Sequence, residues 1–213
     1  MINYNDNLFD YILENSSPES EVLYDLNRHT HLNVVQPRML SGHLQGKILE
    51  MISCMIRPEY ILEIGTFTGY SAICLARGLK QNGKLITLEI DDELEHISLG
   101  YFNKAGLQNV IELIIGDALA IIPGINYKFD LVFIDGNKKD YIKYYNLIIE
   151  KVNSGGFILA DNVLWDGKVT DPSEKDDPDT KAIIEFNKYV CNDKRVENVI
   201  LPVRDGINII KKK

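Results

Sequence analysis

The sequence predicts an α/β protein whose mostly parallel, seven-stranded sheet ends in an antiparallel hairpin. Strand-like apolar runs alternate with helical patterns along most of the 213 residues, which is the order found in doubly wound α/β folds. The runs FDLVFI and FILA are almost continuously apolar, as expected of central parallel strands that are covered on both faces. The closing stretch RVENVILPVRDGINIIKKK contains two strand patterns that meet at Asp205 and Gly206, which is a hairpin signal.

Length and charge restrict the classes of function. The chain is long enough for one domain, in which we distinguish an amino-terminal helical segment (residues 1–36) from the main domain (residues 37–213). The formal net charge of -8 disfavours a general nucleic-acid-binding surface. The chain opens without a signal-peptide pattern and no apolar run approaches about 18 residues, so we expect a soluble cytoplasmic protein.

The spacing of cysteine and histidine does not indicate a transition-metal site. Cys54, Cys74 and Cys191 are widely separated and form no C-x-x-C motif, so we expect buried, reduced thiols. His29 and His31 are two residues apart and would not share a helix face, so we expect solvated or capping side chains.

The first predicted elements are helices. Residues 8–33 contain two short helical patterns, and the SPES segment at residues 17–20 supplies a turn and an N-cap between them. Residues 44–56 carry an apolar stripe that predicts a helix packed on the core. The stripe consists of Leu44, Ile48, Leu49, Ile52, Met55 and Ile56. The start of this helix at Ser41 and Gly42 leaves backbone N–H groups free for a ligand or for water.

The stretch YILEIGTFTG at residues 60–69 predicts a buried strand, a tight loop and the start of an amphipathic helix over residues 70–79. Open α/β sheets hold nucleotide-like ligands at such a loop. Only Gly65 and Gly69 remain of a G-x-G-x-x-G pattern, so a pyrophosphate fits poorly. A nucleoside without phosphates fits better, and S-adenosylmethionine is the commonest such cofactor. Its carboxylate could lie at the positive end of the helix that begins near Ser71; the alternative is a turn without a ligand.

The second strand, KLITLEID, ends at Glu89, whose carboxylate would be placed to accept both hydroxyls of a ribose. Residues 92–105 follow as a helix that is capped by Asp91 or Asp92 and ended by Gly106. Together with the first loop, Glu89 favours a nucleoside site.

The third strand, NVIELIIGDA, leads to Asp117 and Ala118. Asp117 could accept a hydrogen bond from the exocyclic amine of adenine. It could equally cap the short helix predicted over residues 118–122.

Two neighbouring strands of the predicted sheet end in oxygen-bearing side chains. Asp135 follows the fourth strand, and Asp161 and Asn162 follow the fifth, which we expect to be opened by Gly155 and Gly156. Carboxyl ends of adjacent parallel strands lie about 5 Å apart, so these groups should converge. Two carboxylates and an amide oxygen suit Mg²⁺, Mn²⁺ or Ca²⁺ rather than zinc. The alternative is that the acids cap the helices that follow them.

Lys138 lies on the turn after Asp135, at the same edge of the sheet. Next to a dication and a sulfonium, like-charge repulsion would lower its pKa and favour the neutral form that a general base needs. Lys139 is a competitor, and a solvated surface lysine is the alternative for either residue.

The last third of the chain begins with DGKVTDPSEKDDPDT at residues 166–180, an acidic and proline-rich surface loop that favours a lid or a mobile segment. A last helix should open at Asp179 and Thr180 and run through Tyr189. Pro202 restricts the first hairpin strand to a position where a missing N–H does no harm. The closing KKK is expected to be a solvated tail.

Several separated motifs, in the same order, resemble the cation-dependent O-methyltransferases, the caffeoyl-CoA and catechol O-methyltransferase group with its small bacterial members. The motifs are MLSGHLQGKIL, ILEIGTFTGYSA, LITLEID, FDLVFIDGNKKDYIKYY, GGFILADNVLWDGKV and LPVRDGI, and the similarity runs from about Pro37 to the carboxyl terminus. The resemblance implies a Rossmann-like S-adenosylmethionine-dependent methyltransferase fold, with residues 37–213 as the catalytic domain, and a homodimer.

The resemblance also implies roles for single residues. Asp135, Asp161 and Asn162 match the metal ligands, Lys138 matches the proposed base, and Lys138 and Trp165 lie where the family contacts the acceptor. The positions that match residues around S-adenosylmethionine are Met39, Ser41, Glu63, Gly65, Phe67, Ser71, Glu89, Asp117, Ala118 and Asp135.

The sequence departs from the family at several positions. Gly136 and Asn137 replace the His-Trp pair of the animal catechol enzymes and the Ala-Asp pair of the plant enzymes, so adenine packing and acceptor fit do not carry over. Arg204 stands where the plant pattern has glycine. The amino-terminal 30 residues match no substrate-recognition pattern.

Three hypotheses of function follow. The first is metal-dependent methyl transfer from S-adenosylmethionine to one hydroxyl of a catechol-type small molecule, without a membrane partner. The second keeps the enzyme but makes hydroxylated uridine in tRNA the acceptor, with Lys138, Lys139, Lys143, Lys168 and the lysine tail as a basic rim; the net charge of -8 weighs against it. The third is a module that binds S-adenosylmethionine without chemistry.

Overall fold

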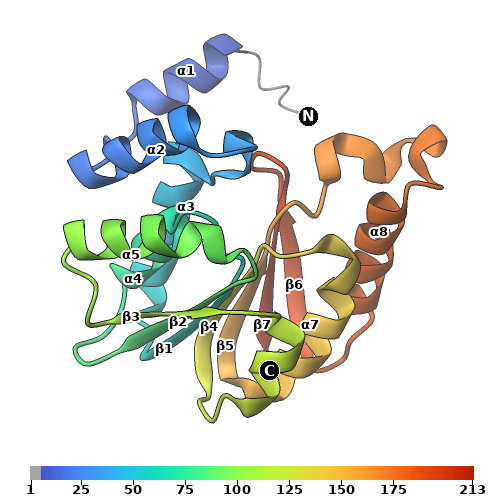
Figure 1. The fold of residues 1–213 in the computed structure, drawn as a ribbon. Coiled ribbons are helices and arrows are strands. Elements are labelled where there is room, and N and C mark those ends of the chain that lie inside the picture. Colours follow the sequence, from blue (N-terminus) through green and yellow to red (C-terminus); the bar gives the residue numbers. More distant parts are fainter. Residues whose placement is uncertain (1–5) are drawn as a thin grey trace.

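The computed structural model describes residues 6–213 and shows one mixed sheet with helices on both faces (Figure 1). The strands lie in the order β3-β2-β1-β4-β5-β7-β6, and among these seven β7 alone runs opposite to the other six. The strands are β1 (Tyr60–Ile64), β2 (Lys84–Glu89), β3 (Ile111–Ile115), β4 (Phe129–Ile134), β5 (Val152–Ala160), β6 (Val196–Leu201) and β7 (Ile207–Lys212). The predicted α/β class and the antiparallel hairpin at the end of the sheet are confirmed.

Helices connect the strands. The α-helices are α1 (Asp6–Glu14), α2 (Glu21–Asn33), α3 (Gly42–Ile56), α4 (Tyr70–Ala76), α5 (Glu95–Lys104), α6 (Ala118–Ile121), α7 (Tyr141–Ile148) and α8 (Pro178–Cys191). Short 3₁₀ helices are η1 (Pro37–Met39), η2 (Asp92–Leu94), η3 (Ile122–Gly124), η4 (Lys138–Asp140), η5 (Ile149–Lys151), η6 (Trp165–Thr170) and η7 (Pro172–Glu174). Within residues 6–213, no helix combines the length and the apolar character needed to cross a membrane.

The central strands contribute to two cores because their side chains alternate between the faces of the sheet. In β4, Val132 and Ile134 pack into one core, while Leu131 and Phe133 pack into the other. Helices α6, α7 and α8 close the first core, and α2 to α5 close the second (Figure 1). Burial on both faces explains why the sequence of this strand is a nearly continuous apolar run.

The predicted amphipathic character of α4 is wrong. All seven residues of the helix are buried, because it packs between α3 and the sheet. Gly46 permits the close approach of α3: a Cβ atom at this position would lie 2.5 Å from Cε1 of Tyr70. A helix that is covered on all sides does not need a polar face.

The buried face of α3 also differs from the predicted apolar stripe. The helix buries Gln45, Leu49 and Ser53, whereas Met55 exposes 76% of its surface. The hydroxyl of Ser53 donates to the carbonyl of Leu75 at 2.6 Å, so a hydrogen bond contributes to the packing of α3 against α4. Apolar periodicity therefore identified the helix but not the face that it buries.

The region after β5 is more regular than the predicted loop. Residues 166–180 contain most of η6 and all of η7, and α8 begins at Pro178, before the predicted start. The carboxylate of Asp177 caps α8 by accepting from the backbone N–H of Thr180 at 2.8 Å. Strand β5 likewise begins at Val152, ahead of the two glycines that were expected to open it.

The carboxyl terminus is not a solvated tail. Lys211 and Lys212 belong to β7, and Nζ of Lys212 donates to the carbonyls of Ile149 and Val152 at 2.7 and 3.0 Å. The lysine run therefore stabilises the end of the sheet opposite to the carboxyl ends of the parallel strands.

Of the three cysteines, Cys74 is buried, but Cys54 and Cys191 are exposed, which contradicts the expectation for these two thiols. They lie on the outer surface of α3 and at the end of α8. His31 contacts a backbone carbonyl of its own helix, and His29 packs edge-on against a tyrosine ring. Within the described residues, no three His, Cys, Asp or Glu side chains gather as a metal site.

Glu63 on β1 is a fully buried carboxyl group below the loop that follows the strand. The hydroxyl of Thr87 donates to its Oε2 at 2.5 Å. Burial raises the pKa of Glu63 to about 8, because hydrogen bonds from Ser71 and Thr87 offset only part of the desolvation and the charges of Asp135 and Glu89 add to it.

We expect the replacement Glu63→Gln to remove a pH dependence of stability. From the ordinary pKa of glutamate, 4.5, up to about 8, the folded chain keeps a proton that the unfolded chain has released, so the free energy of unfolding falls as the pH rises. For one proton the slope is about 1.4 kcal/mol per pH unit. Urea unfolding of both proteins at pH 5, 6, 7 and 8 measures the difference. Parallel pH profiles would show that Glu63 is ionised in the folded state.

Candidate active site

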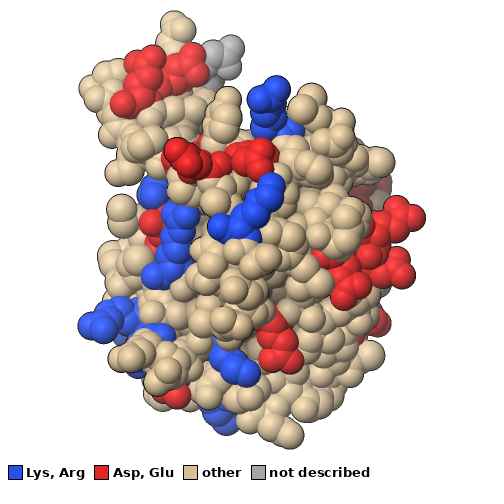
Figure 2. Space-filling model, turned by 60° about the vertical axis from the view of Figure 1, so that its left-hand side comes forward, with Lys and Arg blue, Asp and Glu red and all other residues tan. Residues whose placement is uncertain are grey.

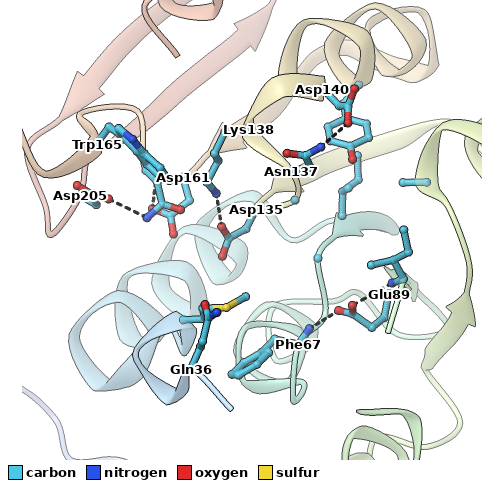
Figure 3. Close-up of a pocket in the computed structure, with 18 of the residues that line it drawn as sticks. Gln36, Phe67, Glu89, Asp135, Asn137, Lys138, Asp140, Asp161, Trp165 and Asp205 are labelled. Carbon is cyan, nitrogen blue, oxygen red and sulfur yellow. Dashed lines mark hydrogen bonds and ion pairs between the residues drawn. The ribbon is translucent and has the colours of Figure 1, made fainter. Parts of the chain in front are cut away.

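A cleft of about 1450 Å³ lies along the carboxyl ends of β1 to β5 (Figure 3). Single small-molecule sites usually have volumes of about 300–1,000 Å³, so this cleft has room for two ligands side by side. In Figure 3, Phe67 and Glu89 lie on one side, Trp165 and Asp205 on the other, and Asp135 and Lys138 between them. The cleft therefore has two halves that meet at the carboxyl end of β4.

The loop after β1 forms the floor of the first half. Gly65 has φ +99, and a Cβ atom there would lie 2.4 Å from the carbonyl oxygen of Asp135. Only glycine allows the loops after β1 and β4 to come this close. The backbone of Phe67 turns into the left-handed region, with φ 51, and its N–H points to the next strand.

Glu89 at the end of β2 has a fixed carboxylate. It accepts from the backbone N–H groups of Phe67 at 2.6 Å, Ile90 at 2.9 Å and Asp91 at 3.0 Å. A carboxylate has about four lone-pair positions, so three are used and one is left on a group that lines the cleft. Such a fixed acceptor suits one hydroxyl of a ribose, not both as the sequence predicted.

Asp117 caps a helix at the wall of the cleft, and its hydrogen bond to adenine stays a prediction. Its side chain caps α6 by accepting from the N–H of Leu119 at 2.9 Å. Asp117 and Ala118 also line the cleft, next to the Glu89 side. Capping therefore holds Asp117 at the wall of the pocket.

Asp135 and Asp161 bring two carboxylates together at the ends of β4 and β5. The Asp161 side chain is almost completely buried; its Oδ1 accepts from the N–H of Asn162 at 2.8 Å, and its Oδ2 accepts from Nε2 of Gln45 at 2.5 Å. Burial and the charge of Asp135 hold the pKa of Asp161 well above its usual range. The pair therefore carries negative charge that a cation would stabilise.

Lys138 is the cation that compensates this charge. Its Nζ donates to Oδ1 of Asp135 and to the hydroxyl of Tyr141, both at 2.8 Å, and that hydroxyl donates to the carbonyl of Asp161 at 3.1 Å. Burial alone would lower the pKa of Lys138, but the charge of Asp135 and the hydrogen bonds outweigh it and raise the pKa. This raised pKa belongs to Lys138 paired with Asp135, and the lowered pKa expected next to a dication and a sulfonium stays a prediction.

The donor set fits a hard divalent cation. Asp135, Asp161 and Asn162 offer two carboxylates and an amide oxygen on the wall of one cleft, without a sulfur or imidazole ligand in the set. Burial first and the charge of Asp135 second raise the pKa of Asp161, so a cation bound here would favour its ionised form. Asn162 adopts a left-handed backbone, with φ 56, which asparagine tolerates better than most residues.

The loop after β5 is held by the turn between β6 and β7. Val163 N–H donates to the carbonyl of Gly206 at 3.1 Å, and Leu164 N–H donates to that of Asp205 at 2.8 Å. Trp165, which follows, has a left-handed backbone with φ 50 and lines the second half of the cleft. The hairpin therefore shapes the half of the cleft that lies farther from Glu89.

Most of the residues singled out from the sequence line this cleft. They are Met39, Gly65, Phe67, Glu89, Asp117, Ala118, Asp135, Lys138, Asp161, Asn162 and Trp165. Ser41, Glu63 and Ser71 do not line it but are buried, and Ser71 donates a hydrogen bond to Glu63.

Sequence reasoning missed Gln45, Tyr141, and the site role of Arg204 and Asp205. Gln45 is a polar residue four positions before buried Leu49 on one helix, which is a usable signal. Tyr141 lies three residues after Lys138. A local pattern identifies Asp205 only as a turn residue, because it does not reveal contacts with the loop after β5.

The chain and its fold are similar to known methyltransferases. The family model described as O-methyltransferase matches residues 13–213. Caffeoyl-CoA O-methyltransferase of Eucalyptus gunnii is 34% identical over 221 residues, which cover 97% of this chain and 88% of the relative.

Two solved structures have nearly the same fold. The methyltransferase PaMTH1 of Podospora anserina, bound to SAH (S-adenosylhomocysteine), has a TM-score of 0.91 and 26% identity, with 100% of this chain and 98% of that chain covered. The O-methyltransferase TomG of Streptomyces achromogenes, in complex with SAM (S-adenosylmethionine), has a TM-score of 0.90 and 28% identity, with 97% and 96% covered. Both structures contain the cofactor or its demethylated product.

Proposed function

Because this chain belongs to the O-methyltransferase family and is an S-adenosylmethionine-dependent enzyme of the caffeoyl-CoA O-methyltransferase type, we propose that it methylates one hydroxyl of a vicinal diphenol and uses a divalent cation. The family match confirms the resemblance found in the motifs and sets aside the module without chemistry. The observation that carries the proposal is that Asp135 and Asp161 lie beside Lys138 between the two halves of the cleft, and that Asn162 lines the same cleft.

Asp135, Asp161 and Asn162 would hold the cation with oxygen ligands. When bound, it would lower the pKa of a phenol, which is ordinarily near 10, and orient the two neighbouring oxygens of the acceptor. Asp161 is kept in place by Gln45 and by the backbone of Asn162, so its carboxylate needs little rearrangement. A vicinal diphenol presents two neighbouring oxygens that the cation could bind together.

Lys138 is the group that would take the acceptor proton. It is held at the cleft wall by Asp135 and Tyr141. In the ion pair it is protonated, so it can serve as a base only when the charge of Asp135 is engaged elsewhere. Once its own proton has passed to solvent, neutral Lys138 would take the proton of the acceptor hydroxyl at Nζ. S-adenosylmethionine would supply the methyl group to the acceptor oxygen and would be released as S-adenosylhomocysteine.

The lysines that would form a basic rim for tRNA are paired with acids. Lys138 contacts Asp135, and the remaining pairs are Lys139–Asp179, Lys143–Asp140 and Lys168–Glu174. On the face drawn in Figure 2, basic side chains are scattered among acidic ones and form no continuous patch. This pairing removes the support that a basic rim would have given to a tRNA acceptor.

We expect Asp161→Asn to abolish cation-stimulated methylation, with a fall of at least about 100-fold in kcat. The replacement keeps the shape of the side chain but removes a charged ligand. Turnover of a panel of catechols and of bulk tRNA is measured with labelled S-adenosylmethionine, with Mg²⁺ and with a chelator. Asp176→Asn, at an exposed acid in the loop before α8, is the matched control and should behave like the unmodified chain. Equal turnover in Mg²⁺ and in chelator would contradict the role of the cation, and label in RNA alone would contradict the acceptor.

A second pair of variants tests the base. Lys138→Ala should lower kcat by about 10² to 10⁴, since it removes the proton acceptor, while the affinity for S-adenosylhomocysteine stays the same. Lys139→Ala is the control, because this neighbouring lysine exposes 54% of its side chain and lies 3.8 Å from Asp179. Steady-state kinetics and calorimetry make the comparison. A larger loss in Lys139→Ala than in Lys138→Ala would transfer the role to Lys139.

A further inference from the structure

The turn between β6 and β7 sends two adjacent charged residues toward the cation ligands. Arg204 has a left-handed backbone, with φ 47, and its guanidinium reaches α3. Asp205 contacts the loop after β5 through Asn162 and the N–H of Asp166. The side chain of Arg204 can only donate hydrogen bonds, and that of ionised Asp205 can only accept them.

Arg204 determines which way the amide of Gln45 faces. Its Nη1 donates to Oε1 of Gln45 at 3.0 Å, and the same nitrogen donates to the carbonyls of Leu40 and Ser41, which fix the guanidinium. Because a guanidinium cannot accept, the oxygen of Gln45 must face Arg204. The NH₂ group then faces Oδ2 of Asp161 at 2.5 Å.

The reversed amide would be costly at this position. It would place the NH₂ group against the guanidinium and the oxygen against a carboxylate, so that two donors and two acceptors would face each other. Gln45 exposes only 1% of its surface, so water cannot satisfy these groups.

Asp205 orients the amide of Asn162 as a hydrogen-bond acceptor, whereas Arg204 orients that of Gln45 as a donor. Its Oδ2 accepts from Nδ2 of Asn162 at 3.2 Å. A carboxylate requires the NH₂ group on its side, and the amide oxygen of Asn162 is therefore left free for the cleft that this residue lines.

We propose that Arg204 and Asp205 are positioning residues that set the cation affinity of the site, by fixing the orientation of the amides of Gln45 and Asn162. The inference rests on the proposed use of a cation. Arg204 holds Asp161 through Gln45, and Asp205 turns the oxygen of Asn162 toward the ligand position. Neither Arg204 nor Asp205 would bind the cation directly, so both act on its ligands and not on the reacting atoms.

The test is the affinity of the purified full-length chain for Mn²⁺, measured by calorimetry in the presence of S-adenosylhomocysteine. Asp205→Asn and Arg204→Gln introduce groups that both donate and accept, so the facing amides can rotate; we expect Mn²⁺ binding to weaken by about 10- to 100-fold in each. Arg204→Lys keeps a group that only donates, and we expect it to stay within about threefold of the unmodified chain. S-adenosylhomocysteine affinity, which reports on folding and on the other half of the cleft, should be unchanged in all three.

The outcomes separate this inference from the proposed function. If the unmodified chain binds Mn²⁺ and Asp205→Asn and Arg204→Gln bind it equally well, the positioning roles are wrong and the cation site stands. Equal losses in Arg204→Lys and Arg204→Gln would also contradict the donor-only argument. If the unmodified chain binds no Mn²⁺, the proposed cation fails and this inference fails with it.

Discussion

Two carboxylates at the ends of neighbouring strands are the constraint on which the site depends. Asp135 and Asp161 lie close enough for the charge of one to raise the pKa of the other, and Asp161 is almost fully buried. Such a pair is stable only beside positive charge or hydrogen-bond donors. The structure supplies Lys138, Tyr141 and Gln45 around it. A hard cation would compete with Lys138 for the same charge, which links proton acceptance by Lys138 to occupation of the site.

The order of the strands explains why these groups meet. β4 and β5 pair in parallel next to β1, so the loops after all three open at one edge of the sheet. Strand β6 runs toward the same edge, where the 204–205 turn leads into the antiparallel β7. The proposed cofactor half is built from the loops after β1 to β3, and the proposed acceptor half from the loop after β5 and the hairpin. In this proposal one sheet edge would serve both substrates, with the acids in the middle.

Local sequence patterns predicted the sheet and the residues at its carboxyl edge well. A strand that is buried on both faces is recognisable as an apolar run, and the residue that follows the run must lie at the edge of the sheet. Asp135, Asp161 and Asn162 could be found in this way, and so could Glu89. The features that local patterns did not predict depend on tertiary contacts. Helix α4 is buried on all sides, α3 buries Gln45, and Nζ of Lys212 donates to a backbone carbonyl instead of facing solvent. The protonation of Lys138 could not be predicted from sequence, because it depends on the distance to Asp135.

The most direct test of the central claim is the location of a bound cation. Crystals of the protein with S-adenosylhomocysteine are soaked in Mn²⁺, and the anomalous difference density is calculated. The account predicts one strong peak within about 2.5 Å of carboxylate oxygens from both Asp135 and Asp161 and of the amide oxygen of Asn162. A fully occupied Mn²⁺ elsewhere in the cleft, or none at these residues under conditions in which Mn²⁺ stimulates turnover, would contradict it.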